Sequence, residues 1–413
     1  MKSIIQLSLI VAFAVNQTFS QPVPNEPKNV AIFLYEGVEL LDFAGPGEVF
    51  SASGFKTYTV SVDGLELTSQ QFLKIKPEYS IQNAPVPDII VFPGGSSGAS
   101  SKNPAVIEWI RKCHSQGANF LSVCTGAFII AKAGLLDKKR ITTHWGSIKN
   151  LAQQYPGSTV MENTRWIDNG SVITTAGVSA GIDGALHYVA RIRGNDAAQR
   201  TAHYMEYDKW NPENGIVDVK NDYLENVVRG NKPVLNGKAP FPGEYLNYAA
   251  MLVTKGENVK AKQVAEDGIR VYPKFDELYK VLRIAKQKLG ESVPADEAEI
   301  LALVRDGKVQ EAVIRYEKEK KAFPHWNIFG ENAMNDAAYF LLLEKKDIAG
   351  AIKAFELNTL AFPESPNTFD SLGEAYLVAG NKKEGVANYR KAAAMGYENA
   401  RKVLKELEAN SSQ

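Results

Sequence analysis

Short apolar runs alternate with helical patterns in the first half of the chain, between Asn29 and about Asn211. Continuous runs of Val, Ile and Phe are typical of strands buried on both faces, as in a parallel sheet covered by helices. Such runs occupy residues 30–35, 88–93, 120–123 and 171–175. Apolar residues at helical spacing occupy residues 103–116, 127–136 and 181–193. This alternation predicts an α/β domain over residues 29–211, a flavodoxin-like three-layer sandwich with a parallel sheet.

The pattern changes after about Trp210. Residues 212–240 carry Asn, Gly, Lys and Pro without a lasting period and are interpreted as a linker. Beyond it, an alanine is followed four residues later by a small or aromatic residue and twelve residues later by proline. The three examples are Ala261/Ala265/Pro273, Ala312/Tyr316/Pro324 and Ala351/Phe355/Pro363. This pattern resembles the tetratricopeptide repeat and predicts an all-α helical-repeat domain over residues 241–405, the alternative being an unrelated helical bundle.

Repeats of this kind contact only their neighbours and present an extended concave face. We therefore expect a protein or peptide partner at the C-terminal repeats. We also expect the two halves of the chain to be separable, so that a protein ending near Asn231 folds on its own.

The first twenty residues have the features of a secretory signal peptide. Lys2 precedes about a dozen mostly apolar residues, and a polar, proline-bearing stretch begins at Gln21. We expect cleavage near Ser20 and a periplasmic or secreted mature protein; an uncleaved anchor is the alternative. No second apolar run approaches the ~20 residues that a membrane span requires, so we expect no membrane span.

Composition narrows the classes of function. Apolar residues make up 45% and charged residues 23% of the 413 residues, which is typical of a soluble globular protein. Lys plus Arg equals Asp plus Glu at 47 each, so no basic field favours nucleic acid. Two cysteines exclude a disulfide scaffold, and no metal-ligand spacing or dinucleotide motif is present. We therefore expect no metal, no cofactor and no nucleic-acid partner.

Cys124 lies where a predicted buried strand turns into a helix. The segment 120–130 reads FLSVCTGAFII, and the three small residues after the cysteine allow a narrow turn. A thiol at a helix N-terminus meets the positive end of the helix dipole, which favours thiolate and lowers the thiol pKa. We interpret Cys124 as a nucleophile; the alternative is a small buried core residue. Cys113, in the middle of the preceding helix, is interpreted as structural.

Four motifs together resemble the ThiJ/PfpI family of the class I glutamine amidotransferase-like superfamily. They are SVCTG at 122–126, PGG at 93–95, TTHW at 142–145 and TAGVSAG at 175–181. Within that family the sequence is most similar to isocyanide hydratases and to the sensor domains of AraC-type regulators. The resemblance spans about 29–211. It implies a possible homodimer through the α/β domain, as family members commonly form.

The resemblance also implies roles for individual residues. Cys124 would attack an isocyanide carbon with Thr125 at the site, and Asp42, in the segment LLDFAGP, would move a proton before water releases an N-formamide. An acid beside a thiol is able to donate or accept a proton when the geometry permits. Asp42 as a helix N-cap is the alternative, and Glu36 and Glu39 lie close enough in sequence to compete.

Glycine allows the backbone to approach a developing negative charge closely. Gly94, Gly95 and the Thr125 amide are therefore candidates for an oxyanion cradle, with Gly177 and Val178 on the opposite wall; the alternative for any one glycine is a tight turn. His144 is a candidate partner for the thiol, as in Cys–His hydrolases, or else a structural histidine.

These observations favour an exported, cysteine-dependent enzyme that acts on a small molecule, with isocyanide hydration through a Cys124 thioimidate as the leading hypothesis. AraC-type regulators join this domain to a DNA reader, whereas this chain carries helical repeats and an export signal. Two alternatives remain. One is a non-catalytic extracytoplasmic sensor or scaffold, and the other is a different thiol activity such as amide hydrolysis or deglycation.

Overall fold

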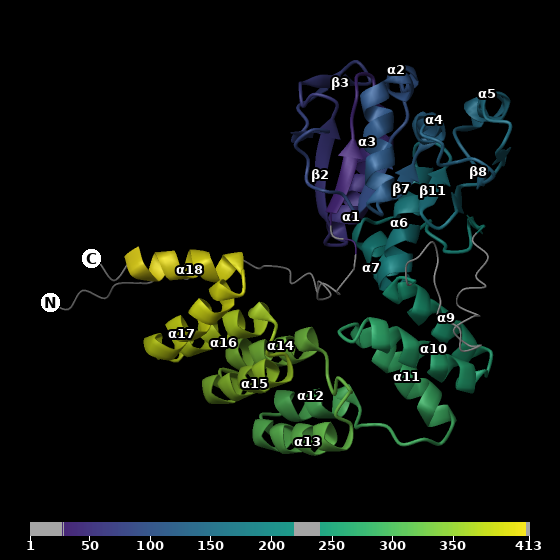
Figure 1. Cartoon of the computed structure of the whole chain (residues 1–413). Helices are drawn as coiled ribbons and strands as arrows, with labels where there is room; N and C mark the ends of the chain where they lie inside the picture. Colours follow the sequence, from purple (N-terminus) through teal and green to yellow (C-terminus); the bar gives the residue numbers. More distant parts are fainter. Residues whose placement is uncertain (1–26, 28, 219–239, 410–413) are drawn as a thin grey trace. The chain divides into compact units, whose positions relative to one another are not determined.

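The computed structural model describes residue 27, residues 29–218 and residues 240–409. The predicted signal peptide and most of the predicted linker lie outside these described residues. The chain forms two compact units, one reaching Val293 and the other beginning at Pro294 (Figure 1). This division lies some fifty residues beyond the linker that the sequence pattern indicates.

An eight-stranded sheet forms the centre of the first unit. Its order is β12 (Ile216–Val217), β10 (Trp166–Asp168), β11 (Val172–Thr175), β7 (Asn119–Ser122), β6 (Ile89–Phe92), β1 (Asn29–Phe33), β2 (Lys56–Ser61) and β5 (Tyr79–Ser80). All neighbouring pairs are parallel except β10 with β11. The predicted α/β fold is confirmed, with the correction that one pair in the sheet is antiparallel.

Helices enclose this sheet in two groups. One group is α1 (Leu40–Ala52), α6 (Ala180–Arg193) and α7 (Asn195–Tyr204), and the other is α2 (Gly98–Lys102), α3 (Pro104–Ser115) and α4 (Ala127–Lys132). Trp109 of α3 packs against Phe33 and Phe92, while Tyr188 of α6 donates to the Phe120 carbonyl. The strands are buried because both faces of the sheet are covered.

Smaller elements surround the carboxyl edge of the sheet. They are the hairpin β3 (Leu67–Ser69) and β4 (Leu73–Ile75), the pair β8 (Arg140–Ile141) and β9 (Thr159–Val160), the short helices η1 (Cys124–Gly126) and η2 (Trp145–Ser147), and α5 (Ile148–Gln154).

The first unit also includes three helices from the region predicted to form repeats: α9 (Pro242–Thr254), α10 (Asn258–Val271) and α11 (Asp276–Lys288). Helix α9 packs on α6, where buried Arg191 donates to Glu244 at 3.0 Å. A Cβ on Gly243 would lie 2.4 Å from the Gly194 nitrogen and 2.6 Å from the Ala190 carbonyl oxygen. The first helices after the predicted linker are therefore packed tightly against the α/β domain.

The second unit is helical throughout its described residues. It contains α12 (Glu297–Arg305), α13 (Val309–Ala322), α14 (Glu331–Tyr339), the π-helical η3 (Phe340–Lys345), α15 (Ile348–Ala361), α16 (Pro366–Val378), α17 (Lys382–Ala394) and α18 (Glu398–Ala409). The alanines and aromatic residues of the sequence triplets are buried, and each proline follows the end of a helix. An all-helical C-terminal region is confirmed, and its tetratricopeptide character stays a prediction.

Candidate active site

The candidate site lies where the carboxyl ends of four neighbouring strands meet. Asp42 is in the first turn of α1, which follows β1, while Gly94 follows β6. Cys124 follows β7, and Gly177 lies between β11 and α6. β1 lies between β2 and β6, so the chain first builds the sheet on one side of β1, with β2 and β5, and then crosses to the other side, with β6 and β7. Open α/β sheets bind ligands at such switch points, outside the carboxyl ends of their strands.

Cys124 occupies a strained turn, as the sequence pattern predicts for a nucleophile elbow. Its φ angle is +56°, a left-handed conformation that costs about 1–3 kcal/mol for a residue other than glycine. Two contacts maintain the turn: the Cys124 amide donates to the Ala176 carbonyl at 2.9 Å, and the Thr143 hydroxyl donates to the Cys124 carbonyl at 2.6 Å. Gly126 is required here because a Cβ would lie 1.9 Å from the Phe92 carbonyl oxygen.

The Asp42 carboxylate is fully buried and accepts two hydrogen bonds from distant parts of the chain. The Gly94 amide donates to one oxygen at 2.8 Å and the Val178 amide to the other at 2.9 Å. Asp42 is therefore not an N-cap of α1. Of the two competing acids, Glu36 accepts from the Thr68 amide, and Glu39 occupies the N-cap position without a side-chain cap.

The thiol and the carboxylate shift each other's pKa. Burial, and next the negative charge of Asp42, raise the pKa of Cys124 to about 12, against hydrogen bonds from Thr125 that lower it. Burial likewise raises the pKa of Asp42 to about 6, against its bonds from Gly94 and Val178 and from the Cys124 thiol. These shifts correspond to a thiol that donates to an ionised carboxylate at neutral pH.

This electrostatic balance differs from the thiolate that the sequence pattern predicts. Helix α4 has only six residues, and Cys124 lies in the short helix before it, so the helix dipole is weak there. Desolvation and a neighbouring anion are the larger effects. The expectation of a lowered thiol pKa is therefore wrong.

The amides proposed as an oxyanion cradle have other partners. Those of Gly94 and Val178 donate to Asp42, and that of Gly95 donates to the Thr125 hydroxyl at 3.1 Å. The Thr125 amide remains directed at the sulfur, because it lowers the pKa of Cys124. In this structure Gly94 and Val178 orient the carboxylate, whereas Thr125 is the residue that is placed to stabilise negative charge on the sulfur.

Gly177 lies between the thiol and His144. A Cβ on Gly177 would lie 3.4 Å from Cys124 Sγ and 2.5 Å from the Cδ2 atom of His144. His144 Nδ1 accepts from the Gly146 amide at 3.3 Å, which caps η2. The largest influences on the Cys124 pKa are burial, Asp42 and Thr125 rather than this imidazole. His144 is thus near the site, with one ring nitrogen bound to the Gly146 amide, and its role as a partner of the thiol stays a prediction.

Three further residues shape the site without having been singled out from the sequence. Thr143 and Ala176 hold the carbonyl and amide of Cys124, and both belong to motifs that the sequence analysis quotes. Buried Tyr35 lies near the carbonyls of Pro93 and Gly94, with its hydroxyl 2.8 and 2.7 Å from their oxygens. Its position at the end of the first strand run was the one available signal.

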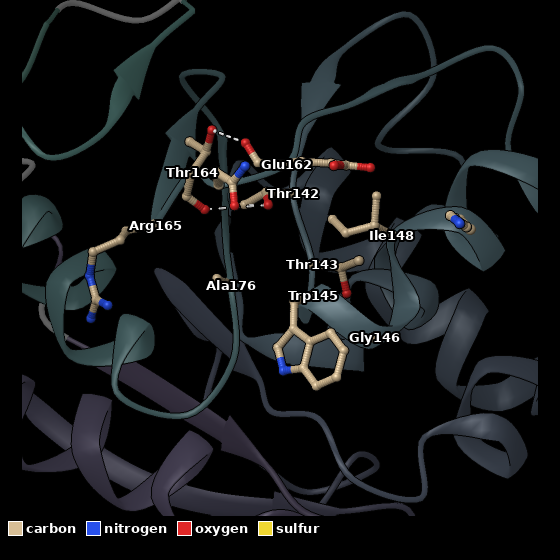
Figure 2. A pocket seen from close by; sticks show the side chains of 11 residues that line it. Thr142, Thr143, Trp145, Gly146, Ile148, Glu162, Thr164, Arg165 and Ala176 are labelled. Atoms are coloured by element: carbon tan, nitrogen blue, oxygen red, sulfur yellow. Dashed lines mark hydrogen bonds between the residues drawn. The ribbon is translucent and has the colours of Figure 1, made fainter.

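A pocket of about 780 Å³ lies beside this turn (Figure 2). Thr143 and Ala176 form part of its wall, Trp145 and Ile148 form another part, and the segment 162–165 closes it. Among the described residues, no group of three or more His, Cys, Asp or Glu side chains has the arrangement of a metal site. Nor is any described helix both long and apolar enough to cross a membrane.

Comparison with known proteins places these residues in a family. The model of the DJ-1/PfpI family matches residues 28–191. An isonitrile hydratase of Pseudomonas putida is 33% identical over 180 residues, which are 43% of this chain and 78% of that protein. The chain belongs to the DJ-1/PfpI family. All of the site residues described above lie within the matched range.

Another relative is named as a transcriptional regulator rather than an enzyme. The HTH-type transcriptional regulator CdhR of Pseudomonas aeruginosa is 29% identical over 149 residues, covering 36% of this chain and 44% of that protein. Among solved structures, a ThiJ/PfpI family protein from Pseudomonas syringae is 29% identical and covers 47% of this chain and 81% of its own, with a TM-score of 0.42. The relatives named above are thus one enzyme and one transcriptional regulator.

Proposed function

We propose that the α/β domain hydrates an isonitrile to an N-substituted formamide, with Cys124 as the nucleophile and Asp42 as the group that moves the proton. The observation that carries this proposal is the buried thiol paired with a carboxylate whose pKa is about 6. The 33% identity to an isonitrile hydratase supports it.

The proposed reaction has two steps, formation of a thioimidate on Cys124 and its hydrolysis. Asp42 accepts the thiol proton while Sγ bonds to the terminal carbon of R–NC, and the proton passes to that carbon, which gives the thioimidate R–N=CH–S–Cys124. Water then adds to the thioimidate carbon. The C–S bond breaks, the sulfur recovers a proton, and R–NH–CHO leaves. The sum is R–NC plus water giving R–NH–CHO.

The electrostatics of the site suit this substrate. A thiol with a pKa of about 12 is protonated at neutral pH, so attack and deprotonation have to be coupled, and the ionised Asp42 is positioned for that. Both of its oxygens are fixed by the amides of Gly94 and Val178. The Asp42 carboxylate, with Glu39 nearby, disfavours an anionic substrate, whereas an isonitrile is neutral.

Formamide production from a panel of isonitriles tests the proposal. We expect turnover by the wild type and by Cys113→Ala, which removes a buried thiol outside the site. Cys124→Ala and Asp42→Asn should each lower kcat/KM by roughly 10²-fold or more. Mass spectrometry of quenched reactions should find the mass of R–NC added at Cys124.

A second measurement separates a proton-transfer role of Asp42 from a role in folding. Because Asp42 raises the pKa of Cys124, Asp42→Asn should speed the alkylation of Cys124 by iodoacetamide at neutral pH even as turnover is lost. A folded protein that turns over no isonitrile, or a Cys124→Ala variant that remains active, would instead favour a sensor domain, as in the regulator relatives.

We also propose that the chain is exported. The proposal rests on the charged start and apolar run of residues 1–20. Fractionation of cells that produce the full chain, followed by N-terminal sequencing of the mature protein, tests it: a new terminus near Gln21 is expected, and an intact Met1 in the cytosol contradicts it.

A further inference from the structure

The pocket beside the cysteine turn shares its wall with the groups that hold the nucleophile. Ala176 and Thr143, which bind the amide and carbonyl of Cys124, both line it. Gly177 lies next to both Sγ and His144, and the His144 ring centroid lies 5.4 Å from that of Trp145. The pocket and the thiol are thus neighbours that share the residues Thr143 and Ala176.

Trp145 is the most distinctive residue of the pocket. Its side chain is 83% exposed, although a large apolar ring is normally covered. Figure 2 shows the indole beside Gly146 and Thr143, and residues 162–165 line another part of the same pocket. An exposed indole on the wall of a concave site offers a flat surface on which a ring stacks favourably.

The remaining lining favours an uncharged group. The hydroxyls of Thr142, Thr143 and Thr164 donate to backbone carbonyls, so they present methyl groups and acceptor lone pairs but no free donor. The Arg165 guanidinium is bound to Asp183 and Ser179, and Figure 2 shows that it points away from Trp145.

Ile148 and Ala176 contribute further apolar surface to the same pocket. Charged groups are present in the lining at Glu162 and Lys149, both exposed side chains that carry opposite charges. The apolar part of this lining, together with the indole, is thus suited to a ring, while exposed Glu162, Lys149 and Asn163 provide polar surface in the same pocket.

We propose that this pocket binds the N-substituent of the substrate and that Trp145 selects isonitriles with an aryl or alicyclic substituent over small alkyl isonitriles. This inference rests on the proposed isonitrile hydration. It adds a specificity-determining residue and a substrate class to that reaction.

A comparison of two substrates tests the inference. We expect Trp145→Ala to lower kcat/KM for phenyl isonitrile by about tenfold or more, mainly through KM, because a stacked ring loses its partner. The value for methyl isonitrile should change less than about twofold. Trp145→Phe should restore most of the preference. Tyr204→Ala, which removes another exposed aromatic side chain at the end of α7, is the matched control and should change neither value.

Thiol alkylation provides a readout that does not require turnover. Cys124 is labelled with iodoacetamide and with its N-phenyl derivative, and the ratio of the two rates is compared between wild type and Trp145→Ala. A Trp145-dependent preference for the phenyl reagent, without turnover of any isonitrile, supports the pocket and contradicts the proposed reaction.

The protein could turn over isonitriles while Trp145→Ala changes neither the phenyl-to-methyl ratio of kcat/KM nor the ratio of the two alkylation rates. That result overturns the pocket assignment and leaves the proposed reaction intact. A preference for the phenyl compounds that changes with protein concentration also overturns it, because Trp145 would then be covered by a second copy of the chain.

Discussion

At the scale of single residues, the site depends on one buried carboxylate. Asp42 fixes the amides of Gly94 and Val178, which come from loops after two different strands, and it accepts from the thiol. Its charge therefore orders the loops and also raises the pKa of Cys124. Because this carboxylate is buried, its ionisation is costly in the folded protein, and the free energy of unfolding should depend on its protonation.

Stability should depend on pH through Asp42. Burial raises its pKa from 3.8 to about 6 in the folded protein, so between these values the folded state binds the proton more tightly than the unfolded state. The contribution is fully present below pH 4 and is lost as the pH rises through 6. We expect it to amount to about 3 kcal/mol. Urea unfolding of wild type and Asp42→Asn at pH 4, 5, 6 and 7 measures the difference.

Asp208→Asn, a substitution of an exposed acid, is the control and should follow the wild-type pH profile. If Asp42→Asn and wild type have parallel profiles, the Asp42 pKa is ordinary and its proposed role as a proton acceptor near pH 6 loses its basis. The same pKa predicts that kcat/KM rises with pH through about 6, because the ionised carboxylate is the active form.

At the scale of elements, the central strands could be predicted because their apolar runs are continuous. The runs at 30–35, 88–93 and 120–123 correspond within two residues to β1, β6 and β7. The short pairs β3–β4 and β8–β9 have two or three residues each and leave too weak a pattern. The antiparallel β10 was likewise invisible, since strand direction depends on pairing.

The candidate site, like the strands, could be predicted only in part from the sequence. Cys124 was found because it follows a strand run, whereas Asp42 was implied by the family resemblance, which places an acid after the first strand. Gly94 and Val178 were expected at the site as well, but their hydrogen bonds to Asp42 were not, because they lie 52 and 136 residues from it in sequence. Which amide faces the carboxylate is decided only by folding.

The contact between α6 and α9 should contribute strongly to stability. Arg191 and Glu244 are both largely buried, and Arg191 also pairs with Asp168, so removal of Glu244 takes away one carboxylate partner of a buried arginine. Glu244 also accepts from the Phe241 amide at the start of α9. We expect Glu244→Ala to lower the free energy of unfolding by about 2 kcal/mol in urea titrations, because two largely buried donors lose their acceptor. Glu257→Ala breaks an exposed pair with Lys260 and should change little; equal effects of the two variants would contradict the assignment.

At the scale of the whole molecule, the structural division differs from the one that the sequence pattern indicates. Composition changes near residue 212, but compact packing changes at Val293. A composition shift marks a difference in local preference, whereas a compact unit is defined by contacts between distant residues. We therefore propose that the α/β domain needs α9 to α11, so that a protein ending near Asn231 is less stable than one ending at Val293.

Two truncated proteins test the revised boundary. A protein of residues 21–293 retains α9 to α11 and should be monodisperse, cooperatively unfolding and as active as the full chain. A protein of residues 21–231 lacks Glu244 and exposes the surface of α6 that α9 covers, so it should aggregate or unfold at a clearly lower temperature. Size exclusion and circular dichroism compare them. Equal stability of the two would show that α9 adds nothing to the α/β domain.

The close contact between Gly243 of α9 and the end of α6 also limits where recombination can join this chain to another. With a Cβ only 2.4 Å from the Gly194 nitrogen, no other residue at position 243 allows α9 to settle on the end of α6 without a shift of backbone. A DJ-1/PfpI domain borrowed from another gene would bring a different end of α6 and would meet α9 with the wrong surface. We therefore expect that an exchange of domains preserves folding only when β1 to α11 stay together and the break point falls after Val293.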